Sequence, residues 1–235
     1  MWDYYGYKPR TKPKDPAAQL AKLRKKNPDI KPVTIEGRKL ARSWWALAWN
    51  KNLESYADYE SRIGRGRSYV RSGAVLDLSV ASGGAKALVQ GSGSKPYEIS
   101  ISIKPLQKKR WDAIMAKCSH KIANLEDLAA GKFPEELTVL FTDKAFGLFP
   151  SPKEISFSCS CPDWAYMCKH VAATLYGIGA RFDEDPLLFF TLRDIDFTEL
   201  LKKSIEEKMK SMLTNAESIT PRVMEGVDTF ELFGV

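Results

Sequence analysis

Residues 74–104 alternate between apolar and polar side chains with a period of two, which is the pattern of strands that bury one face. Clusters of glycine and serine at 82–84 and 91–94 interrupt the alternation and predict turns. We therefore expect a three-stranded antiparallel meander with one polar face. Its strands cover residues 74–80, 86–90 and 97–103.

Apolar residues at helical spacing predict several helices around this sheet. One stripe in residues 36–60 carries Trp44 and two more tryptophans, which we expect in the core. A second stripe, in 105–125, makes Cys118 a core residue by position. The other predicted helices cover 17–26, 135–141, 170–182 and 197–213. A meander with separate helices is typical of the α+β class.

Three of the four cysteines and one of the two histidines lie in a single stretch, 157–171. They form the pattern Cys-x-Cys-x6-Cys-x-His, a Cys3His set of the type that closes structural zinc sites. The four candidate ligands are Cys159, Cys161, Cys168 and His170. Because four protein ligands leave no open position for water, the sequence predicts one structural ion. Zinc suits thiolate and imidazole best, and iron is the alternative for a sulfur-rich site.

The spacing brings the two ligand pairs together from two elements. Apolar residues alternate with serines over 155–161, which predicts a strand, and residues i and i+2 of a strand face the same way. A turn over 162–167 leads to the helix predicted from His170, so the second pair lies at the helix start. We expect Trp164, in the turn, to shield the ion from water.

Three other interpretations of the cysteines are weaker. A disulfide within the Cys-x-Cys pair would need a strained loop that an extended strand does not offer. Burial in a core is common for cysteine but requires no paired spacing. Cys118 and His120 repeat the Cys-x-His spacing, but no Cys-x-Cys pair lies near them in the sequence, so we do not expect them to bind the ion.

The cysteine stretch resembles the SWIM zinc finger, whose pattern is Cys-x-Cys, a variable gap and Cys-x-His, and the four ligand positions match one for one. The flanking residues are similar to the prokaryotic branch of that family, and further similarity extends over roughly residues 40–195. The resemblance implies a small ββα-like finger that binds DNA or protein. It also implies a helicase-like ATPase of the Swi/Snf type as a partner.

Positive charge is concentrated at the front of the chain. Residues 1–71 hold 17 lysines and arginines against seven acids, whereas residues 181–235 hold seven against 12. Such asymmetry favours a polyanionic partner for the front and a basic protein partner for the back. The opening residues, interrupted by prolines, predict a flexible basic arm that also carries aromatic residues.

Three groups of basic residues are candidate nucleic-acid contacts. Four arginines interleaved with glycines predict a phosphate-contacting loop, because glycine lets a backbone approach a ligand and the guanidinium matches phosphate geometry. A solvated loop whose arginines pair with nearby acids is the equal alternative. The loop arginines are Arg62, Arg65, Arg67 and Arg71, and the other candidates are Lys108, Lys109, Arg110 and Lys169.

The chain is expected to be a non-enzymatic zinc-binding adaptor that binds DNA or RNA mainly independently of sequence. The absence of a nucleophile motif and the closed ligand set argue against an enzyme. The alternative is a protein–protein interaction module, or a structural subunit, without direct contact to nucleic acid. Phosphate binding weakens steeply as salt rises, and an apolar interface does not, which separates the two.

Composition indicates the cellular compartment of the protein and the division of the chain into regions. No apolar run approaches the roughly 20 residues of a membrane span, and the first residues lack the pattern of a signal peptide. Cysteines in a metal pattern fit a reducing compartment, so we expect the cytoplasm and no membrane contact. We expect four regions: a basic arm (1–35), an α+β domain (36–150), the finger with its helix (151–192), and an amphipathic helix with an acidic tail (193–235).

Overall fold

The computed structural model of the protein describes residues 14–56, 60–118, 142–143 and 147–216. The chain divides after Phe197 into two compact units. The N-terminal arm up to residue 13, the helix predicted over 135–141 and the acidic tail from residue 217 lie outside the described residues.

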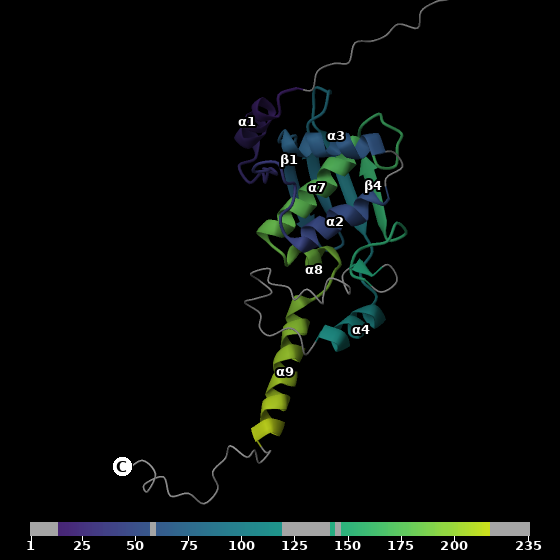
Figure 1. Cartoon of the computed structure of the whole chain (residues 1–235). Coiled ribbons are helices and arrows are strands. Elements are labelled where there is room, and N and C mark those ends of the chain that lie inside the picture. Colours follow the sequence, from purple (N-terminus) through teal and green to yellow (C-terminus); the bar gives the residue numbers. More distant parts are fainter. Residues whose placement is uncertain (1–13, 57–59, 119–141, 144–146, 217–235) are drawn as a thin grey trace, which may run out of the picture. The chain divides into compact units, whose positions relative to one another are not determined.

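The first unit contains a four-stranded antiparallel sheet (Figure 1). Its strands, in spatial order, are β1 (Val75–Ala81), β2 (Gly84–Val89), β3 (Tyr97–Ile103) and β4 (Ile155–Cys159). The predicted meander is confirmed, and the strand of the cysteine stretch joins it as β4, with Ile103 opposite Ile155 and Ile99 opposite Cys159. The α+β class is therefore confirmed. The small ββα unit is not confirmed, because the cysteine stretch contributes only the strand β4, which pairs with β3 of the meander.

Seven described helices accompany the sheet. They are α1 (Pro16–Lys26), α2 (Trp44–Glu54), α3 (Glu60–Arg71), α4 (Lys108–Cys118), α7 (Lys169–Glu184), α8 (Leu188–Leu192) and α9 (Phe197–Ala216). The predicted helix over 36–60 is shorter than expected, because α2 begins only after Ser43, whose hydroxyl accepts a hydrogen bond from the Ala46 N–H. Asp183, from the end of α7, accepts from the Ser43 hydroxyl and so fixes this start. No described helix is long and apolar enough to span a membrane.

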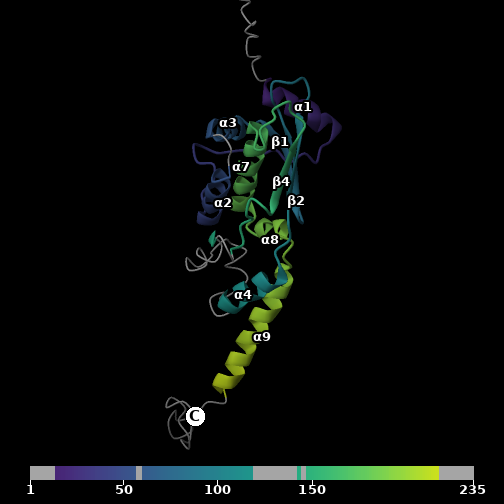
Figure 2. The ribbon, with the colours of Figure 1, turned by 90° about the vertical axis from the view of Figure 1, so that its right-hand side faces the viewer.

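Helix α7 is the centre of the first unit. It lies against one face of the sheet, and α2 and α3 cover its other side, so the unit has three layers (Figure 2). Twelve of its 16 residues are buried, which a helix covered on both sides requires. Trp49 of α2 is fully buried, donates a hydrogen bond from Nε1 to the Leu175 carbonyl and meets Phe182 edge to face. The prediction of core tryptophans is confirmed for Trp49.

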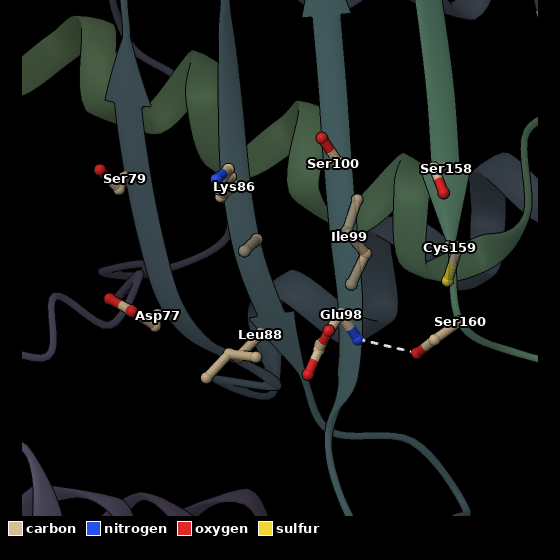
Figure 3. A pocket seen from close by; sticks show the side chains of 11 residues that line it. Asp77, Ser79, Lys86, Leu88, Glu98, Ile99, Ser100, Ser158, Cys159 and Ser160 are labelled. Carbon is tan, nitrogen blue, oxygen red and sulfur yellow. Dashed lines mark hydrogen bonds between the residues drawn. The ribbon is translucent and has the colours of Figure 1, made fainter.

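The opposite face of the sheet is polar, as the alternation predicts. Ser79, Lys86, Glu98, Ser100 and Ser158 are exposed on it (Figure 3). They line a hollow of about 590 Å³ that runs across all four strands.

The arginine–glycine stretch forms helix α3 rather than the predicted loop. Ile63, Gly66 and Val70 recur at helical spacing and are buried on the side that meets α7. A Cβ atom at Gly66 would lie 2.5 Å from the Cβ of Ala172 in α7. This glycine therefore brings two helices together, where the sequence suggested the approach of a ligand.

A buried ion cluster joins the start of β4 to α4 and α8. Arg193 has no exposed side-chain surface and donates to Glu154 at 2.9 Å, and Arg110 donates to the same carboxylate at 3.2 Å. Although burial opposes ionisation, hydrogen bonds from Ser151 and Arg193 hold the pKa of Glu154 at about 2, below its ordinary 4.5. The stability that this carboxylate contributes is present above pH 4.5 and is lost as the pH falls toward 2.

Most of helix α9 belongs to the second unit. The amphipathic pattern predicts a helix at this position. Four apolar side chains of this helix are more than half exposed in the structure. They are Ile205, Met209, Met212 and Leu213.

The helix crossing at Gly66 can be tested by a matched pair of alanine variants. Gly66→Ala is expected to lower the free energy of unfolding by about 1–3 kcal/mol, because the added methyl overpacks the contact with Ala172. Gly64→Ala adds the same methyl to the same helix, where nothing lies within 4 Å, and is expected to stabilise by about 0.5–1 kcal/mol. Urea unfolding followed by circular dichroism measures both, and equal effects of the two variants would contradict the crossing.

Candidate metal centre

The four predicted ligands converge at the junction of β4 and α7. Cys159 ends the strand, Cys161 follows it, Cys168 is the N-cap of the helix and His170 lies in its first turn. Their ligand atoms all lie within 4.8 Å of one another. The end of the strand and the helix start therefore bring the two pairs together, although the strand predicted over 155–161 ends at Cys159 and Cys161 lies after it.

The distances fit tetrahedral coordination. The His170 Nδ1 atom lies 3.8 Å from the Cys159 sulfur and 3.9 Å from the Cys168 sulfur. Ordinary Zn–S and Zn–N bond lengths give edges of about 3.8 Å between two sulfurs and about 3.6 Å between sulfur and nitrogen. The four side chains could hold one metal ion.

The three thiols of the cluster differ in how readily they ionise. A hydrogen bond from the Cys159 thiol, helped by His170, lowers the pKa of Cys168 to about 3. Donating that bond raises the pKa of Cys159, and burial raises the pKa of Cys161. One thiolate thus forms readily, and the other two thiols need added positive charge to ionise. A divalent ion bound between them would supply it.

Aromatic packing fixes the histidine ring. His170 is 1% exposed, and its ring centroid lies 4.5 Å from that of Tyr97 and 5.4 Å from that of Tyr69. A Cβ at Gly91 would lie 2.5 Å from the Tyr97 ring and 2.8 Å from His170 Nε2, so only glycine leaves room for both rings. Nε2 makes no hydrogen bond to a described residue. Ring contacts therefore orient this ligand in place of the usual outer hydrogen bond.

Sequence reasoning missed the roles of Gly91, Tyr69 and Tyr97. The sequence pattern predicts a turn at Gly91 and connects neither tyrosine with the histidine. The resemblance covered all three positions, but one sequence does not show which ring they would meet. Their common function depends on a contact between β3, α3 and α7.

Several residues of the turn between the ligand pairs are anchored to the first unit, whereas Trp164 in the same turn is exposed. Met167 is 1% exposed, and the Tyr166 hydroxyl donates to the Ile155 carbonyl at 2.9 Å. Arg62 of α3 pairs with Asp163 at 3.1 Å, which ties the turn to the first unit's outer layer. Trp164 is 81% exposed, so the expectation that it shields the ion is wrong. The buried residues before α7 anchor the turn and leave this indole outside.

The candidate nucleic-acid contacts do not form one site. Along α3, Arg62 turns to the metal centre, while Arg67 pairs with Glu54 and Arg71 donates to the Arg38 carbonyl. Arg110 belongs to the buried ion cluster. The remaining candidates Arg65, Lys108 and Lys109 are exposed, and Lys169 is half-buried.

Comparison with known proteins gives a relative. The chain is 37% identical over 183 residues to the uncharacterized protein Rv2102 of Mycobacterium tuberculosis, a match that covers 74% of this chain and 66% of that protein. No protein-family model matches the chain, and no solved structure matches it.

Metal binding is tested by one ligand substitution and one matched cysteine substitution. Cys168→Ser keeps a favoured helix N-cap but removes a thiolate. We expect its metal affinity to fall at least about 100-fold, since losing an outer-shell partner alone costs about 10–100-fold. Elemental mass spectrometry of purified protein should find one metal ion per wild-type chain and almost none in the variant. Cys118→Ser, outside the cluster, should keep the ion, and equal retention by both variants would exclude the proposed ligand set.

Proposed function

We propose that the protein is a non-enzymatic adaptor whose Cys3His centre binds one structural zinc ion and which binds nucleic acid through phosphates. The observation that carries the proposal is the convergence of three sulfurs and one imidazole nitrogen within 4.8 Å. Thiolate-rich sets with imidazole favour zinc over harder divalent ions. Four protein ligands close the coordination shell, which supports a structural ion and gives no metal-bound water for catalysis.

The surface beside the centre supports contact with nucleic acid. Trp164 is 81% exposed in the turn between the ligand pairs, and Lys169 begins the helix that follows. Arg65 is exposed on α3, whose Arg62 reaches the same turn. An exposed indole near cationic side chains is typical of surfaces on which unpaired bases stack. We call Arg65, Trp164 and Lys169 the finger face.

A protein partner is the second candidate. The exposed side chains of Ile205, Met209, Met212 and Leu213, between 57% and 64% accessible, form an apolar series on α9. Methionine and leucine on one helix suit docking into a groove of another protein. By the SWIM resemblance, that partner would be a Swi/Snf-type ATPase in the cytoplasm. Both functions are compatible in one adaptor.

Fluorescence anisotropy of the zinc-loaded protein with labelled single-stranded DNA, duplex DNA and RNA tests the proposal. We expect binding at about 50 mM salt that weakens by orders of magnitude toward about 200 mM, because phosphate contacts release counterions. Similar affinity for unrelated sequences of one nucleic-acid type is expected, since phosphate contacts carry no sequence information. A folded, metal-loaded protein that binds none of the three at low salt would overturn the nucleic-acid part and leave the protein-partner candidate.

A further inference from the structure

A basic hollow of about 640 Å³ lies between residues 38–42 and helices α2 and α3. Six cationic side chains line it, together with one carboxylate, that of Glu54. The cations are Arg38, Lys39, Arg42, Lys51, Arg67 and Arg71. Only Arg67 and Arg71 were candidate contacts from the sequence. The other four come from segments that the fold brings beside α3.

Most of this charge is uncompensated. Glu54 is occupied by Arg67 at 2.5 Å and by the Tyr176 hydroxyl, also at 2.5 Å. Arg42 pairs with Glu36 at 3.3 Å, but both side chains are more than 60% exposed, so solvent screens the pair. Among the described residues, no carboxylate forms an ion pair with the other four cations. Those four are Arg38, Lys39, Lys51 and Arg71.

Several contacts hold the hollow in place before any ligand arrives. Arg71 donates from Nη2 to the Arg38 carbonyl at 3.2 Å, which ties the 38–42 segment to α3. Asp183 accepts from the backbone N–H of Arg42 at 2.7 Å and of Ser43 at 2.9 Å, which fixes the other end of the segment at α7. A preformed site loses less conformational entropy on binding than a flexible one.

The lining suits a chain of phosphodiesters. Arginine forks and lysine ammonium groups around a concave surface bind phosphate oxygens. The apolar side chains of Leu40 and Leu47 also line the hollow, and Leu47 is 51% exposed. Alternating phosphates and sugars present both anionic and less polar surface, which such a mixed lining can contact.

We infer that the basic hollow holds phosphodiester groups of a bound nucleic-acid backbone. This inference rests on the proposed function and assigns its main phosphate site to α2, α3 and residues 38–42. The finger face, whose residues do not line the hollow, then contributes less of the electrostatic affinity. The assignment predicts that the cations lining the hollow determine how steeply the nucleic-acid affinity falls with salt.

The test compares three variants in salt-dependent anisotropy, using the same labelled single-stranded DNA, duplex DNA and RNA. The hollow variant is Arg38→Ala/Lys39→Ala/Lys51→Ala, and the finger-face variant is Arg65→Ala/Lys169→Ala. The matched control, Lys86→Ala/Lys95→Ala/Lys153→Ala, removes three exposed cations that do not line the hollow. Metal content and circular dichroism confirm folding. If the hollow variant is misfolded, Lys39→Gln/Lys51→Gln replaces it, because both side chains are exposed.

The hollow variant is expected to reduce the salt slope by about 3 for duplex DNA and to weaken binding at least about tenfold at low salt. The finger-face variant should reduce the salt slope less than the hollow variant does, and the control should change neither the slope nor the affinity comparably. If the wild type binds but the hollow variant behaves like the control, the hollow assignment is wrong and the proposed function stands. If the wild type binds no nucleic acid, both fail together.

Discussion

The junction between β4 and α7 is the constraint on which the rest of the structure depends. Cys159 ends β4 and Cys161 follows it, Cys168 and His170 begin the central helix, and their ligand atoms lie within 4.8 Å. Because α7 lies between the sheet and the outer helices, the direction in which it starts sets the positions of both layers. A metal ion at this junction would fasten the last strand to the core helix at a point where only a short turn connects them.

Helix α3 carries structural contacts on one side and the proposed phosphate site on the other. Gly66 and its buried neighbours press the helix onto α7, and Arg62 anchors the turn of the metal centre. Arg67 and Arg71 face the basic hollow, one neutralised by Glu54 and one not paired with any described acid. One helix thus links the candidate metal centre to the proposed phosphate site. If an ion is bound at the junction, its loss is expected to disturb the hollow, because α7 contacts both α2 and α3.

The sequence predicted what depends on local periodicity and spacing. The strands of the meander, the helix after His170 and the four ligands follow from period-two alternation, helical stripes and the Cys-x-Cys and Cys-x-His pairs. The prediction of a loop for the arginine–glycine stretch is wrong, because packing of Gly66 on Ala172 overrides the low helix propensity of glycine. The expectation that Trp164 shields the ion is wrong. The sequence did not predict the contacts of Gly91 with two rings or the basic hollow. The Gly66 contact, the ring contacts at Gly91 and the basic hollow each join segments far apart in the chain, which no single window of sequence contains.

Hydrogen–deuterium exchange of the metal-loaded and chelator-treated protein, read by mass spectrometry, tests the central claim most directly. If the ion fastens β4 to α7, its removal should speed exchange in peptides that cover β4 and the first turns of α7. Peptides from α1, which has no ligand, should change much less. Unchanged protection of β4 and α7 after verified metal loss would contradict the account, because the junction would then be held by packing alone.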